Sequence, residues 1–192
     1  MMMRHRSQCI ALTALFLTLL TAPGLAEDSE VSRATLKGIR AVRIIVEEFQ
    51  PSLQKYTDKL GPTAAQIHLD IERRLREGDI QVVEANEWLR IPGRPVLYVS
   101  INTHETEKYS YVYNIKVELR QIAYLEANKE VRALADTWSI NMTGMANIGN
   151  LNIVKNDVMV LVERFVHAYR AANKELNKSE HSQPSSASDY SV

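Results

Sequence analysis

The sequence predicts an α+β fold: a two-layer sandwich in which a mixed sheet of about five strands carries two helices on one face. Several short segments alternate apolar and polar residues, which is typical of half-buried strands. Two other segments repeat apolar residues every three or four positions, as amphipathic helices do. Along the chain these patterns follow the order β-α-β-β-β-β-α.

The best-defined unit is the segment 36–83. It begins with a strand of alternating β-branched residues around 41–46, and a helix follows after a connection. Thr63 and Gln66 have the spacing of a capping box at the start of that helix, and Gly78 is suited to its end. We therefore expect a strand, a helix and a second short strand at the beginning of the domain.

Three further strands are predicted as a meander over 95–103, 109–125 and 131–140. The run 141–149 (NMTGMANIG) is predicted to be a flexible loop. A terminal amphipathic helix is expected from Asn150. The domain as a whole is placed at 36–174.

The rest of the domain's chain is predicted to be connections and polar ends. The connection 48–61 contains Pro51, and the loop 84–94 contains Trp88 as a single buried anchor. The flanking segments are a polar leader at 27–35 and a disordered polar tail at 175–192.

The first 26 residues have the layout of a cleaved secretory signal. Arg4 and Arg6 precede the apolar run 10–20, and small residues lead up to Ala26. The apolar run is too short to span a bilayer. We expect cleavage after Ala26 and a periplasmic or secreted location; a buried N-terminal helix is the alternative.

Composition excludes several classes of site in the mature chain. Cys9 is the only cysteine and lies before the apolar run, so the exported part has neither disulfides nor a thiol nucleophile. Without Arg4 and Arg6 the formally neutral chain becomes slightly acidic, which argues against nucleic acid as a partner. After the signal, no apolar run is long enough for a transmembrane segment.

No motif points to catalysis, a cofactor or a metal. The histidines stand at no metal-ligand spacing, and neither Gly-x-Ser-x-Gly nor a phosphate-binding glycine loop occurs. Carboxylates from distant segments could still converge in space. No catalytic, cofactor-binding or metal-binding residue is therefore predicted, and a hydrolase without a recognisable motif is the third of three functional hypotheses.

Two groups of residues are candidates for partner or ligand contact. Tyr109, Tyr111 and Tyr113 alternate along one predicted strand, and form either an aromatic platform or a face packed under the helices. Met142, Met145 and Ile148 lie in the predicted loop. Their side chains either dock a partner or fold back over the core.

Several segments resemble a family of small exported bacterial proteins without an assigned function. They are LKGIRAVRIIVEEF, IERRLREGDIQVV, PVLYVSIN, YVYNIKVELRQ, ADTWS and FVHAYRAANK. The resemblance covers nearly all of the mature chain to Lys174 but involves structural motifs, so it implies no site. The element order is also loosely similar to the lipopolysaccharide-assembly lipoprotein and to the N-terminal domain of the Tol-system propeller protein, at the level of fold alone.

These observations lead to a non-enzymatic exported domain that binds a protein or cell-envelope partner. A sheet edge, the uncovered sheet face or the methionine-bearing segment would provide the contact, and a homo-oligomer formed through a sheet edge is a related possibility. The rival hypothesis is a carrier of a small lipid or glycan, with a pocket near Tyr109, Tyr111 and Tyr113.

Overall fold

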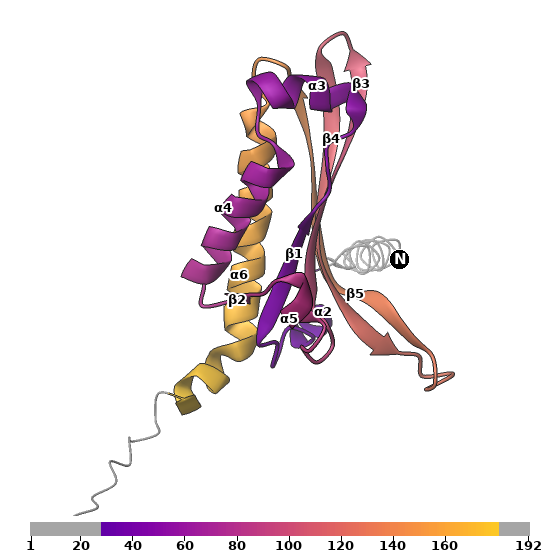
Figure 1. Ribbon diagram of the computed structural model, residues 1–192, viewed down its shortest axis with the longest axis vertical. Coiled ribbons are helices and arrows are strands. Elements are labelled where there is room, and N and C mark those ends of the chain that lie inside the picture. The colour runs from indigo at the N-terminus through magenta and orange to yellow at the C-terminus, as the bar shows by residue number, and fades with distance from the viewer. Residues whose placement is uncertain (1–27, 181–192) are drawn as a thin grey trace, which may run out of the picture.

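The computed structural model of the protein describes residues 28–180. A mixed sheet of five strands, in the order β2-β1-β3-β4-β5, packs against α4 and α6 on one face (Figure 1). The predicted α+β sandwich is confirmed. The predicted signal peptide at 1–26 and the part of the predicted tail beyond Glu180 lie outside the described residues.

The first half of the domain is a strand-helix-strand crossover. β1 (Ala41–Val46) pairs in parallel with β2 (Gln81–Val82) and with β3 (Val96–Glu107). Between β1 and β2 the chain forms α3 (Pro51–Leu60) and α4 (Ala64–Glu77). The capping box predicted at the start of α4 is present, because the Thr63 side chain accepts from the Gln66 amide and the Gln66 side chain accepts from the Thr63 amide.

The helix α3 corrects the prediction of an irregular connection at 48–61. Pro51 is at the start of the helix, where its missing N–H group costs nothing because the first turn has no intrahelical acceptor for it. Leu53 and Thr57, one turn apart, form the buried side of the helix. Proline therefore starts a helix here instead of preventing one.

The second half is an antiparallel meander. β3 is followed by β4 (Ser110–Tyr124) and β5 (Arg132–Asn147), which are 15 and 16 residues long. A register shift between Leu119 and Arg120 marks an irregularity in the β4–β5 pairing. The turn of this hairpin swings away from the helices and the rest of the sheet (Figure 1).

β5 is longer than predicted. The stretch 141–147, predicted as the start of a flexible loop, forms the last part of this edge strand and pairs with β4 as far as Ser110. The alternation of Ile140, Met142, Gly144 and Ala146 toward the helices continues the pattern of the strand. Methionine and glycine replace the usual β-branched residues here, but side chains still alternate between the two faces of the sheet.

The helical content also exceeds the prediction. The leader forms α2 (Glu30–Ala34), with a capping box made by Ser29 and Ser32. A single turn, α5 (Ala85–Trp88), lies in the predicted loop before β3. The terminal helix α6 (Asn152–Glu180) extends past Lys174, so residues 175–180 of the predicted tail are helical. None of the described helices combines the length and apolar composition needed to cross a membrane.

The core lies between the sheet and the two long helices. α4 contributes Ile67, Ile71 and Leu75, as its apolar spacing predicted, and α6 contributes the stripe around Phe165. The largest fully buried side chains are Trp138, Tyr111, Tyr113 and Phe165. Trp138 and Phe165 meet edge to face with ring centroids 5.3 Å apart.

Candidate binding surface

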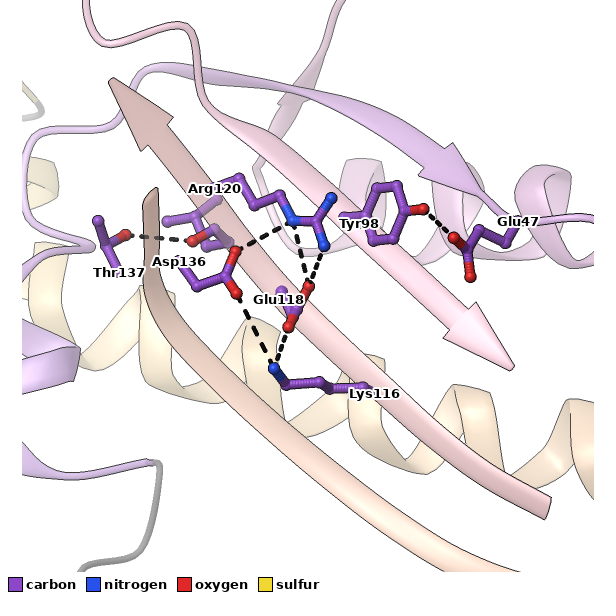
Figure 2. Close-up of polar contacts among 8 residues, drawn as sticks. Glu47, Tyr98, Lys116, Glu118, Arg120, Asp136 and Thr137 are labelled. Atoms are coloured by element: carbon purple, nitrogen blue, oxygen red, sulfur yellow. Dashed lines mark hydrogen bonds and ion pairs between the residues drawn. The ribbon is translucent and has the colours of Figure 1, made fainter. Parts of the chain in front are cut away.

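The open face is the side of the sheet opposite α4 and α6. Its centre is occupied by side chains of β3, β4 and β5 that form one polar network with Glu47, just after β1 (Figure 2). The members of this network are Glu47, Tyr98, Lys116, Glu118, Arg120 and Asp136.

Glu118 is the centre of the network and is only 2% exposed, although it lies on the open face. Arg120 donates to it at 2.6 Å through Nη2, and Lys116 forms an ion pair with its other oxygen. Arg120 also donates to Asp136 at 3.0 Å. Its guanidinium lies 3.6 Å from the centroid of the Tyr98 ring, so one arginine covers both the carboxylate and the phenol.

These contacts move the pKa values of the network. Burial raises the pKa of Glu118, but hydrogen bonds and charge from Lys116 and Arg120 outweigh it, so this pKa lies below its usual range. Burial, followed by the hydrogen bond to Glu47, raises the pKa of Tyr98. Glu118 is thus held ionised with both oxygens engaged, an arrangement suited to holding β4 in place and unsuited to proton transfer.

The hairpin pocket lies farther along the same side, where the loop before β3 meets the β4–β5 hairpin. It is a cavity of about 590 Å³ lined by Trp88, Ile91, Gly93, Arg94, Ile122, Tyr124, Arg132, Ala133 and Leu134. The Ile122 amide donates to the Gly93 carbonyl at 2.7 Å, which fixes the loop against the hairpin. The Trp88 indole donates to the Pro95 carbonyl and lies under the Arg43 guanidinium.

Exposed apolar side chains surround the hairpin pocket. Tyr124 is 63% exposed, and Leu125, Val131 and Leu134 on the same hairpin are exposed as well. Leu89, the residue after Trp88, is also exposed. Arg132 pairs with Tyr124 across the strands and lies 5.9 Å from its ring centroid. A solvated hairpin turn does not need such residues, so this group of apolar side chains marks the hairpin as a candidate contact surface.

The candidate tyrosines are not one row. Tyr111 and Tyr113 lie in β4 and are buried in the core, where the Tyr113 hydroxyl donates to Asp157 at 2.5 Å. Tyr109 lies in the turn before β4 with a φ of 70° and packs edge to face on Tyr56. Neither Tyr111 nor Tyr113 lines either of the two cavities described here.

The candidate residues of the predicted loop belong to β5 and its end. Met142 and Ile148 are half-buried against the core, whereas Met145 points to the open face and is 67% exposed. The structure therefore separates these three residues between the two faces of the sheet.

A second cavity, of about 570 Å³, lies where α3, α4 and α6 approach one another. Its lining includes Leu69, Asp70, Arg73 and Lys155. Asp70 already pairs with Arg73 at 2.6 Å and with Lys155 at 3.3 Å, so the charged groups of this cavity satisfy one another.

Comparisons with known proteins assign no family. No family model matches the chain, and no curated protein matches it. Over residues 28–180, no group of three or more His, Cys, Asp or Glu side chains is arranged to hold a metal ion.

The hairpin pocket was not found from the sequence. Its residues come from 88–94 and from both strands of the hairpin, and only the tertiary fold brings these segments together. One signal was present: Tyr124, Leu125 and Val131 closely flank a predicted turn, where polar residues are expected.

Proposed function

We propose that the protein is an exported, non-enzymatic binding module that contacts a partner protein through the hairpin pocket. The observation that supports this proposal is the cluster of exposed apolar side chains around that cavity, at the free end of a hairpin. Exposed aromatic and aliphatic residues beside a hollow are the usual anchors of protein interfaces.

The charge at the pocket indicates the chemistry of the partner. Arg94 and Arg132 both line it, so an apolar side chain in the cavity would lie close to two arginines. A partner segment that places an aliphatic or aromatic residue next to a carboxylate fits both properties. Arginine favours carboxylates because its planar guanidinium can donate two parallel hydrogen bonds.

Site-specific photo-crosslinking in the native compartment tests this proposal. A photoreactive phenylalanine analogue at Leu125 is expected to capture a discrete partner. The same analogue at Leu69 on α4, a leucine on the other layer that is 63% exposed against 49% for Leu125, provides the control and is expected not to capture it. Replacing Tyr124 and Leu134 by serine should abolish the product at Leu125 without changing the unfolding temperature, because both side chains are exposed.

Capture of the same protein at both positions, or at Leu69 alone, would contradict the proposal. Retention of the product in the doubly substituted protein would show that the hairpin pocket is not the contact. Arg132→Glu tests the contribution of charge separately from that of the apolar side chains. If the crosslinked product is lost in the serine variant but kept in Arg132→Glu, charge has no role in the contact.

The size of the cavity favours a small-molecule carrier as the second candidate. About 590 Å³ is within the range of ligand pockets, and its walls, which combine apolar side chains with two arginines, suit a lipid that bears an acidic group. Native mass spectrometry of protein purified from its own compartment would show an added mass that Leu134→Trp, which fills the pocket, removes. An unmodified mass in both proteins would contradict this candidate.

A further inference from the structure

We propose that a second copy of this chain pairs antiparallel with the outer edge of β5 and continues the sheet across a two-fold axis. This inference is independent of the hairpin pocket. It rests on three properties of the segment 139–148 and the neighbouring side of α6.

The first property is that no further strand within residues 28–180 covers the edge. In the described part of the chain β5 pairs only with β4, and its outer side faces no further strand. From Thr137 to Val154 the sequence contains no charged residue and no proline. Natural edge strands are usually short, charged or interrupted by proline, because a long uncharged edge recruits another strand. The opposite edge meets this rule, since β2 has only two residues.

The second property is an apolar margin along the edge. Met142, Ala146 and Ile148 are only partly buried against the core, and an added strand would cover them further. Val160 on α6 is 46% exposed. It therefore adds apolar surface that the single chain does not cover.

Two contacts place Val160 beside β5. Asp157, three residues earlier, accepts from Tyr113, whose ring lies against Gly144 of β5. Arg164, four residues later, lies close enough to Asp28 to lower its pKa, and Asp28 accepts from the Trp138 indole. Residues three and four apart share one side of a helix, so Val160 lies on the side of α6 next to β5.

The third property is self-complementarity. When two copies of β5 pair about Gly144, the residues toward the helices match apolar with apolar: Ile140 opposes Ile148, and Met142 opposes Ala146. On the open face Thr143 opposes Met145. A two-fold axis perpendicular to the sheet keeps both α6 helices on the same side and brings the two Val160 side chains toward each other.

Analytical ultracentrifugation of the purified protein and two double variants tests this inference. The unsubstituted protein is expected to form a dimer in the micromolar range. Thr143→Lys with Met145→Lys places lysines directly opposite each other in both symmetric pairs, and should raise the dimer dissociation constant at least about tenfold. Thr143→Glu with Met145→Lys places opposite charges in the same positions and should restore the dimer.

The three proteins differ only at two exposed positions, so matching far-ultraviolet circular-dichroism spectra will confirm that each is folded. If the unsubstituted protein stays monomeric at every concentration in the micromolar range, the inference is overturned. A dimer that persists with four lysines would overturn pairing through this edge. Failure of the Glu–Lys variant to recover the dimer would overturn the register centred on Gly144.

Discussion

Gly144 shows how closely one residue can depend on a partner in the next strand. A Cβ at this position would overlap the hydroxyl and ring of Tyr113, which crosses Gly144 on its way to Asp157. The absence of a side chain in β5 is therefore what allows a full tyrosine to be buried from β4.

Gly144→Ala is expected to lower the free energy of unfolding by about 2 kcal/mol, because the tyrosine must move from a packed site. Urea denaturation at a concentration where the protein sediments as a monomer measures the loss. Gly149→Ala is the matched control, since the nearest atom to its Cβ would be the exposed Asn147 amide oxygen at 3.2 Å. Equal stability of the two variants would disprove the role given to Tyr113.

Glu118→Gln is expected to destabilise the fold by about 2 kcal/mol, the scale of a buried hydrogen bond to a charged group. The substitution leaves Lys116 and Arg120 without the carboxylate that they share. Glu72→Gln, which disturbs an exposed pair with Arg76 on α4, should change stability by less than about 0.5 kcal/mol. Urea unfolding at neutral pH compares the two, and a similar small effect from both would mean that the network is not a stabilising element.

At the scale of residues, the sequence predicts which side chains share one face of a strand better than it predicts what each side chain does. Tyr111 and Tyr113 were placed correctly on one face, but only the fold shows that this face is the core. Glu118 alternates with apolar residues along β4, as a solvent-exposed strand residue would. It is buried and paired with Arg120, which also stacks over Tyr98 on the neighbouring strand, a contact that one strand's sequence does not reveal.

Among the elements, α4 was predicted most accurately because its signals are local. A capping box, an apolar stripe and a terminal glycine all lie within one segment. α3 and the end of β5 were missed for the opposite reason. Considered alone, Pro51 and Gly144 predict the interruption of a helix or a strand. In the structure Pro51 begins α3, and Gly144 lies in β5 against the Tyr113 ring.

The cap of α4 provides a prediction at this scale. Thr63→Ala should lower the free energy of unfolding by about 1 kcal/mol, because the Gln66 amide loses its acceptor at the end of the helix. Thr63→Ser keeps a hydroxyl and should retain most of the stability. Thermal unfolding followed by circular dichroism compares both with the parent protein, and identical losses from alanine and serine would rule out capping as the cause.

For the whole molecule, the shifted pKa values predict how stability changes with pH. Hydrogen bonds from arginine lower the pKa of Asp28 and Glu163, and Lys116 and Arg120 outweigh burial in lowering that of Glu118. Because the unfolded chain binds these protons more readily, the stabilisation is present above the ordinary pKa values of 3.8 and 4.5 and is lost as pH falls through the lower folded values.

At alkaline pH the dependence is reversed, and stability falls as pH rises. Burial raises the pKa of four tyrosines above the ordinary value of 10.0: Tyr98, Tyr111, Tyr113 and Tyr169. Their contribution is present below pH 10 and is lost as pH rises through the folded values. Urea midpoints across the pH range should therefore form a plateau that falls below about pH 4.5 and above about pH 10. A midpoint that rose on either side would contradict these assignments.

The order of strands in the sheet also has a consequence for how the chain assembles. β3, β4 and β5 are neighbours in sequence and are joined by hairpins. β1, in contrast, pairs with β2, which follows two helices later, and with β3, which follows three helices later. Closing short loops costs less entropy than closing long ones, so the meander is expected to form first and β1 to enter beside it last. Pulse-labelled hydrogen exchange during refolding should then protect amides of β4 before those of β1; simultaneous protection would indicate a single concerted step.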